Sequence, residues 1–216
     1  MTVSVDQKKL YAVAVLDILD KTYPDATVAL VYGSPWELLV STILSAQCTD
    51  TRVNIVTKTL FKKYKDMRSY ADAVLPEFEQ EIRSTGFYHN KAKNIVNSAR
   101  MILTKFGGEV PQTMEELLEL PGVARKTANI VLTGAYNVVS GIAVDTHVKR
   151  LAGRLGLTKN TDPCKIEEDL MGLIPKNRWG KVNYILVTHG REVCDAKKPA
   201  CGKCTVAKLC PSVFKK

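Results

Sequence analysis

Four of the six cysteines in this 216-residue chain lie close together near its C-terminal end. Cys194, Cys201, Cys204 and Cys210 have the spacing C-x6-C-x2-C-x5-C. Four thiolates so close in sequence can surround one metal centre. Zinc ribbons usually combine two close C-x-x-C pairs about 15–20 residues apart, whereas this segment contains one such pair. A [4Fe–4S] cluster also takes four thiolates, so zinc and iron–sulfur are the two candidate centres.

A lysine near the start of a predicted helix forms a second candidate site. The segment 120–128 reads LPGVARKTA, and its Pro-Gly pair predicts a turn between two helices. The first helix follows Thr113, which forms a capping box with Glu116, and the second is predicted over 123–132. The backbone N–H groups at the start of the second helix suit a phosphate. Lys126 lies near this helix end, where the positive dipole favours a neutral amine or an anionic partner.

A single aspartate is the third candidate. Asp145 follows the apolar run 138–144 and precedes a predicted helix that reaches about Leu155. An aspartate in this position is expected to cap the helix. We assign His147 a structural role, because no second histidine or cysteine lies at ligand spacing near it.

The composition is that of a globular protein, with 45% apolar residues and enough length for one domain or two small ones. No run approaches the roughly 20 apolar residues of a membrane span, and the N-terminus is unlike a signal peptide. We therefore expect an intracellular protein with no membrane partner. The net charge of +9 suits a polyanionic partner. Cys48 and Cys164 are expected to be buried or partly buried thiols.

Helical patterns account for the scaffold. In 5–22 the apolar residues recur at i, i+3, i+4 and i+7, and Ser-Pro and Asp-Pro pairs mark helix starts at 34–35 and 162–163. We predict an all-α protein of about ten helices. The predicted ranges are 5–22, 35–46, 53–64, 70–75, 76–83, 95–106, 114–120, 123–132, 146–155, 163–173 and 179–188.

Taken together, these segments resemble the endonuclease III family of helix-hairpin-helix DNA glycosylases. The segment 120–128 is similar to the family signature LPGVGRKTA, with Ala124 in place of the second glycine. The string VDTH at 144–147 matches the family's catalytic aspartate motif, and the cysteine spacing coincides with its iron–sulfur loop. The resemblance extends from Ser34 to Cys210.

The resemblance implies a two-domain helix-hairpin-helix glycosylase fold with a cluster-binding C-terminal loop. One domain would be a helical barrel over 23–134, with the hairpin at about 113–132. The other would combine 1–22 with 135–216 and hold the cluster. Alanine at position 124 should be tolerated, because a residue that enters a helix has negative φ.

The resemblance also implies an activity, that of a bifunctional DNA glycosylase and AP lyase of base-excision repair. Such an enzyme removes oxidised pyrimidines from duplex DNA through a lysine Schiff base and β-elimination. Lys126 and Asp145 would be the catalytic residues. A [4Fe–4S] cluster on the four cysteines would have a structural or redox-tuning role.

Several further residues would contact DNA. Gln47, in the string LSAQCTD at 44–50, would fill the space that a flipped nucleotide leaves, and Phe87 would be the wedge that is commonly leucine in the family. The implied DNA-contacting residues are Gln47, Phe87, Gly122, Ala124, Lys197 and Lys198. The partner would be double-stranded DNA with damaged pyrimidines or abasic sites, bound by a monomer in the cytoplasm and, in a prokaryote, at the nucleoid.

Three alternatives remain open. A monofunctional adenine or mismatch-thymine glycosylase shares the hairpin and the cluster, but those branches have another residue at the position of Lys126. A noncatalytic hairpin module that binds DNA needs neither Lys126 nor Asp145. An electron-transfer iron–sulfur protein leaves the DNA-binding hairpin unexplained.

Overall fold

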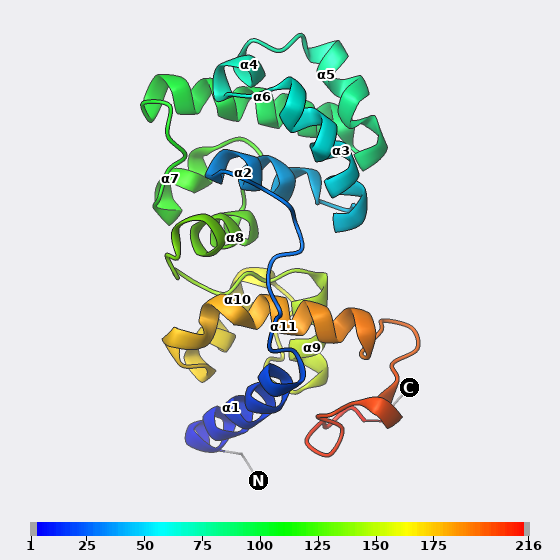
Figure 1. Cartoon of the computed structure of the whole chain (residues 1–216). Coiled ribbons are helices and arrows are strands. Elements are labelled where there is room, and N and C mark those ends of the chain that lie inside the picture. The colour runs from blue at the N-terminus through cyan, green and yellow to red at the C-terminus, as the bar shows by residue number, and fades with distance from the viewer. Residues whose placement is uncertain (1–3, 214–216) are drawn as a thin grey trace. The chain divides into compact units, whose positions relative to one another are not determined.

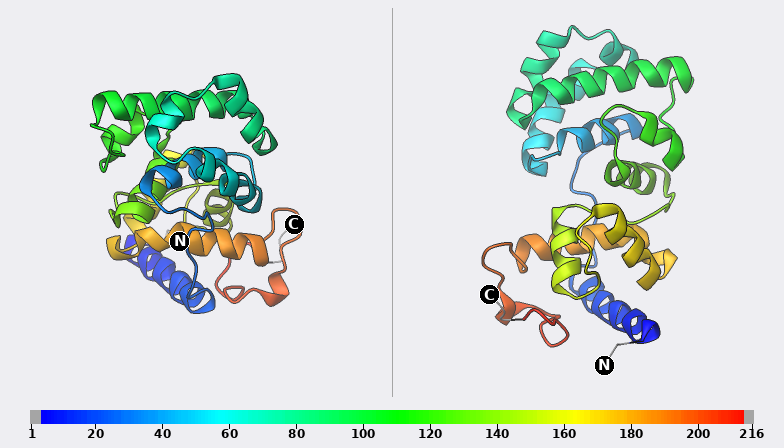
Figure 2. Two further views of the ribbon diagram at one scale, coloured as in Figure 1. Left: turned by 45° about the horizontal axis from the view of Figure 1, so that its top comes forward. Right: turned by 180° about the vertical axis from the view of Figure 1, so that it is seen from behind.

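The computed structural model describes residues 4–213, and every regular element within them is a helix. The predicted all-α fold is therefore confirmed. No helix in this described part is both long and apolar enough to cross a membrane. The described residues divide into two compact units (Figures 1 and 2), one from 29–140 and the other from the described parts of 1–28 and 141–216.

The unit 29–140 is built around one long helix, α6 (Tyr88–Lys105), against which α4 and α5 pack. The rings of Trp36, Tyr64, Tyr70 and Phe78 pack against one another in this unit. The other helices of this unit are α2 (Pro35–Leu44), α3 (Asp50–Lys63), α4 (Met67–Ala71), α5 (Leu75–Ile82), the 3-10 turn Arg83–Thr85, α7 (Met114–Glu119) and α8 (Arg125–Tyr136).

The second unit contains α1 (Val5–Thr22), α9 (Thr146–Arg154), α10 (Pro163–Leu173) and α11 (Trp179–Glu192). Its core is formed by apolar side chains that these four helices bury, including Leu16, Leu151, Leu170 and Leu186. After α11 the chain continues as a loop with a single 3-10 turn, Cys201–Lys203, drawn in red in Figure 1. Val206 of this loop is buried in the core, and Cys194, Cys204 and Cys210 pack against it.

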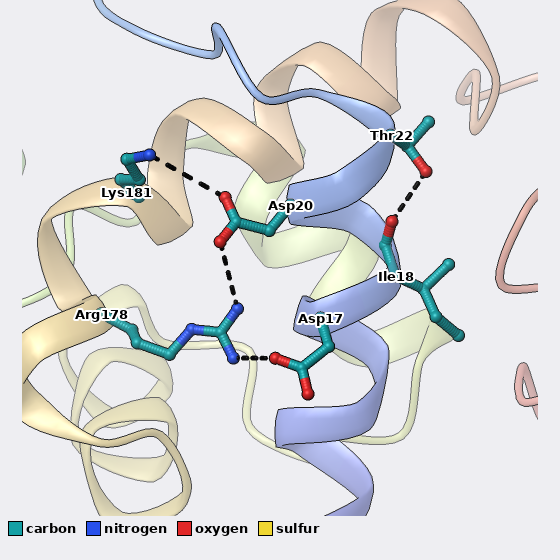
Figure 3. Close-up of polar contacts among 6 residues, drawn as sticks. All are labelled: Asp17, Ile18, Asp20, Thr22, Arg178 and Lys181. Atoms are coloured by element: carbon teal, nitrogen blue, oxygen red, sulfur yellow. Dashed lines mark hydrogen bonds and ion pairs between the residues drawn. The ribbon is translucent and has the colours of Figure 1, made fainter.

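A charged contact ties α1 to the start of α11 (Figure 3). The guanidinium of Arg178, at the end of the 3-10 turn Lys176–Arg178, donates to the carboxylates of Asp17 and Asp20. The ammonium of Lys181 lies 4.0 Å from Asp20. Because exposed ion pairs contribute about 0–1 kcal/mol each, the apolar core holds this unit together.

Several predicted helices differ in their bounds from those observed. The ranges 70–75 and 76–83 are in fact α4 and α5, each of which begins earlier. The carboxylate of Asp66 accepts from the Ser69 N–H at 2.8 Å and so starts α4 at Met67. Helix α6 also begins before the predicted 95, at Tyr88, because Phe87 forms its N-cap without a side-chain hydrogen bond and gives no capping signal in the sequence.

The division between the units lies a few residues later than the boundaries expected at 22/23 and 134/135. Tyr23 and Ala26 pack against the core that contains α1. At the other boundary the hydroxyl of Tyr136 donates to the Val110 carbonyl at 2.7 Å, within the unit 29–140. The residues that follow each expected boundary thus pack with the unit that precedes them.

Candidate functional site

The hairpin turn between α7 and α8 requires a glycine at position 122. The Val123 N–H donates to the Leu120 carbonyl at 3.1 Å, which closes the turn. Gly122 has φ +77°, and a Cβ there would lie 2.4 Å from Nδ2 of Asn94. Both the left-handed backbone and the close approach of Asn94 therefore favour glycine at this position.

The turn is fixed on α6 as well as closed on itself. The hydroxyl of Ser98 donates to the Pro121 carbonyl at 3.1 Å, and Leu120 and Val123 are buried on either side. Ala124 is the N-cap of α8 and has φ −103°, the negative value expected of a residue that enters a helix. Alanine is thus compatible with the backbone at position 124, where the family signature has glycine.

Lys126 is the second residue of α8 and is half-buried, directly before the buried Thr127 and Ala128. The N-cap Ala124 has no side-chain acceptor for the first N–H groups of α8. The turn and the core therefore fix where α8 begins, and this fixes the position of the Lys126 backbone. Lys126 belongs to the unit 29–140, whereas Asp145 belongs to the other unit.

Asp145 caps α9, as predicted. Its Oδ1 accepts from the Val148 N–H at 2.8 Å, and the side chain is half-buried. In the same helix His147 Nδ1 lies 3.1 Å from the guanidinium of Arg150, which donates to the Cys194 carbonyl at 3.1 Å. Contacts thus connect the helix that Asp145 caps with the start of the cysteine loop.

Gln47 and Phe87 share an unusual backbone conformation. Their φ angles are 53° and 50°, in the left-handed region that residues other than glycine rarely adopt. Both side chains are exposed, and Phe87 is 64% exposed. An isolated phenylalanine usually packs in a core, so an exposed one on strained backbone suits a residue that contacts a partner.

The four predicted cysteine ligands come together around one cavity of about 270 Å³, which all four line. Among residues 4–213, no three His, Cys, Asp or Glu side chains form a group that could hold a metal ion. Burial raises the pKa of the Cys204 thiol. Of the other two cysteines, Cys48 is half-buried as expected, whereas the expectation for Cys164 is wrong, because it is exposed in the first turn of α10.

Side chains from outside the loop supply polar contacts to it. A guanidinium N–H of Arg154 donates to the Cys194 Sγ at 3.3 Å, and others donate to the carbonyls of Asp195 and Ala196. The Nε2 of His189 lies 3.4 Å from the Cys204 Sγ, and its Nδ1 lies 3.0 Å from the hydroxyl of Tyr23. Burial lowers the pKa of His189, which favours the neutral imidazole.

These contacts were missed from the sequence. Tyr23 is 166 positions from His189, and Arg154 is 40 positions from Cys194. No local pattern links residues so far apart. The sequence could only have indicated that some N–H donors lie near the sulfurs, since cysteine sulfurs that bind metal are often accompanied by such donors.

Lys197 and Lys198 are exposed within the loop. Their backbone N–H groups both donate to Oδ1 of Asp195, at 2.8 and 2.9 Å. These bonds hold the pKa of the Asp195 carboxyl below its usual value. The backbone of the two lysines is thereby fixed, while their side chains extend into solvent.

Comparison with known proteins agrees with this arrangement. Residues 40–176 match the family model described as HhH-GPD superfamily base excision DNA repair protein. Endonuclease III of Synechocystis sp. is 58% identical over 95% of this chain and 94% of its own length.

Two solved structures are also similar. A trapped covalent intermediate of endonuclease III with DNA, in an estranged-adenine complex, is 43% identical, with a TM-score of 0.91 over 97% of each chain. A thermostable thymine-DNA glycosylase is 25% identical, with a TM-score of 0.85 over 99% of this chain and 100% of its own. The chain therefore belongs to the endonuclease III family, within the HhH-GPD superfamily of base-excision DNA repair proteins.

Proposed function

We propose that this chain is a bifunctional DNA glycosylase and AP lyase of base-excision repair that removes oxidised pyrimidines from duplex DNA. The observation that carries the proposal is that Lys126 is the second residue of α8, just after a turn whose left-handed position is occupied by Gly122. A relative 43% identical to this chain has been trapped as a covalent intermediate with DNA. A covalent intermediate requires a nucleophile, and Lys126 is the residue that we assign to this role.

The lysine reacts with the sugar after the damaged base has left the stack, at an unstacking cost of a few kcal/mol. The neutral amine of Lys126 attacks C1′, so that an N–C1′ bond forms while the glycosidic bond breaks and the base leaves with the electron pair. The sugar ring then opens to a Schiff base. Loss of a C2′ proton expels the 3′ phosphate by β-elimination, which cuts the strand.

The amine must lose its proton before it can attack. A lysine in water is mostly protonated near neutral pH. The helix N-terminus at Lys126 favours the neutral form by a modest amount, and the exclusion of water by bound DNA favours it further. A carboxylate favours the ammonium instead, so we assign Asp145 to accept a proton and to stabilise positive charge that develops on the sugar.

Two features of the cysteine loop support the assignment of a [4Fe–4S] cluster. Four thiols line one cavity, and the Arg154 N–H on the Cys194 sulfur suits a thiolate. We propose that Cys194, Cys201, Cys204 and Cys210 hold the cluster, which when bound cross-links the loop. With four protein ligands the cluster has no open position for substrate, so its role is structural or redox-tuning. The cross-linked loop presents Lys197 and Lys198 to phosphates.

The remaining DNA contacts follow from the exposed segments. We propose that the hairpin at Gly122 and Ala124 binds a phosphate through backbone N–H groups, and that Gln47 and Phe87 enter the duplex. The partner is double-stranded DNA with damaged pyrimidines or abasic sites. The protein acts as a monomer in the cytoplasm, at the nucleoid in a prokaryote.

A second candidate function is monofunctional excision of a mismatched thymine, which the similarity to a thymine-DNA glycosylase favours. Such an enzyme uses water rather than an amine as the nucleophile and leaves an intact abasic site. The two candidates therefore differ in whether a covalent complex and a strand break form.

Borohydride trapping separates the candidates. A duplex with one abasic site should become covalently linked to the protein in borohydride, and Lys126→Ala should abolish the link while DNA binding survives. Undiminished trapping by the alanine variant would assign the nucleophile to another amine. No trapping by the parent protein, together with excision of thymine from a mismatch, would support the monofunctional candidate. Excision rates on a panel of damaged duplexes then test the preference for oxidised pyrimidines.

A further inference from the structure

Lys91 is a buried lysine in the first turn of α6, and its side chain is engaged by the backbone of two other segments. The residue is 4% exposed. Its Nζ donates to the carbonyl of Leu44 at 2.8 Å and to the carbonyl of Thr85 at 2.8 Å. Burial lowers the pKa of this amine, in keeping with an amine withdrawn from water.

The two carbonyls lie at the ends of helical elements. Leu44 is the last residue of α2, and Thr85 is the last residue of the 3-10 turn Arg83–Thr85. Carbonyls at such ends lack partners within their own helix, and the partial negative charge there favours a cation. One amine thus donates to two helix ends, at Leu44 and Thr85, which are 41 positions apart in the chain.

Each of these helix ends leads directly into a short segment that carries a residue assigned to DNA. These segments are 45–49, with Gln47, and 86–87, with Phe87, and we call them the DNA-probing loops. Both residues have left-handed backbone, at φ 53° and φ 50°. Such conformations cost about 1–3 kcal/mol each and persist only where surrounding contacts fix them. The Lys91 backbone N–H also donates to the Phe87 carbonyl, at 3.2 Å.

An apolar side chain of the same length would fill the site of Lys91 but could not make these hydrogen bonds. The two loops would then keep their own turns and lose the group that joins them. Two side chains that enter one duplex together must be held at a fixed separation, because misplacement by about 1 Å can cost about 100-fold in rate.

We propose that Lys91 is a positioning residue that fixes the two DNA-probing loops relative to each other, so that Gln47 and Phe87 enter the duplex together. The inference rests on the proposed function, since it concerns the step in which the damaged nucleotide leaves the stack. Lys91 itself touches neither the DNA nor the reacting atoms in this assignment.

The test uses the full chain with Lys91→Met, which keeps the length and removes the donors. Lys93→Met is the matched control, because Lys93 lies two positions along the same helix, is exposed and loses the same charge. The probe is a duplex with a tetrahydrofuran abasic analogue and 2-aminopurine as the opposite base, whose fluorescence rises when a side chain unstacks it. Single-turnover excision from a damaged duplex is measured in parallel.

We expect Lys91→Met to lose most of the fluorescence rise and to slow excision by about 10-fold to 100-fold at saturating DNA. Lys93→Met should keep both signals. The coupling between Gln47→Ala and Phe87→Ala in a double-mutant cycle should be present in the parent and absent in the Lys91→Met background.

Parent-like fluorescence, excision and coupling in Lys91→Met would overturn the inference and leave the proposed function intact. A parent protein that shows neither signal would instead refute the proposed function. If Lys91→Met does not fold, Lys91→Gln replaces it, because its shorter amide can reach at most one of the two carbonyls. That variant should give signals between those of the parent and zero, and parent-like signals from it would equally overturn the inference.

Discussion

The hairpin turn at 120–124 and the cysteine loop at 194–210 both carry residues assigned to DNA, but they are held by different contacts. In the turn, Leu120 and Val123 are buried and Gly122 closes against Asn94. In the loop, which the structure describes throughout, Val206 is the only fully buried residue. The turn is therefore held mainly by packing, whereas the loop has little buried surface and relies on polar contacts and on the cluster that we propose for its cysteines.

One protein thus holds its proposed DNA-contacting residues in two ways, by packing and by a cross-link. A packed turn tolerates few substitutions at its own residues but needs no ligand. A loop with little apolar burial can tolerate changes on its surface, yet loses its shape when a cross-link is removed.

The largest effect is expected from Cys204→Ser. Loss of one ligand should remove the proposed cluster, abolish the broad visible absorption expected of the parent protein, and lower the free energy of unfolding by about 4 kcal/mol or more. Cys164→Ser is the matched control, because that thiol is exposed outside the loop. A parent protein that is colourless and holds one zinc ion would contradict the cluster assignment.

Gly122→Ala should destabilise the hairpin unit by roughly 2–5 kcal/mol, from a left-handed alanine and from overpacking against Asn94. Denaturant unfolding measures the loss, and adding Asn94→Ala should recover only the steric share. The opposite exchange two positions later, Ala124→Gly, should not lower stability, because glycine is preferred to alanine at a helix N-cap. Equal costs at 122 and 124 would mean that the turn is not held as described.

Asp145→Asn tests a residue whose side chain, like the hairpin, is held by a contact with nearby residues of the chain, the N-cap hydrogen bond from Val148. Asparagine caps a helix about as well as aspartate, so unfolding should change by only a few tenths of a kcal/mol. Single-turnover excision should fall by about 100-fold or more, because the amide cannot accept the proton or stabilise positive charge. Losses of stability and activity in equal measure would leave Asp145 with the capping role alone.

The smallest effect concerns the surface of the loop. Replacing Lys197 and Lys198 with alanine should lower the slope of log affinity against log salt by about 0.9 per lost phosphate contact, with the visible absorption unchanged. Lys8 and Lys9, both exposed on α1, provide a double-alanine control with the same loss of charge. The same slope in both double variants would make the loop lysines a solvated surface.

Much of this protein could be predicted from its sequence, because the signals were local. Ser34, Asp145 and Asp162 start helices through hydrogen bonds that reach two or three residues along the chain, and the hairpin follows from one Pro-Gly pair. These features depend on backbone chemistry that adjacent residues determine. The cysteine spacing likewise placed four ligands together, since a short loop restricts where its thiols can lie.

The distant groups that support those local features could not be predicted, because their contacts arise from the packing of the helices. Tyr11 of α1 donates to the carbonyls of Leu155 and Leu209, and no pattern within α1 foretells this contact with the cysteine loop. The exposure of Phe87 and the burial of Lys91 also reverse the usual preferences of an aromatic ring and an ammonium group. Burial and long-range hydrogen bonds depend on how helices pack in three dimensions, and residues that meet there can be far apart in the sequence.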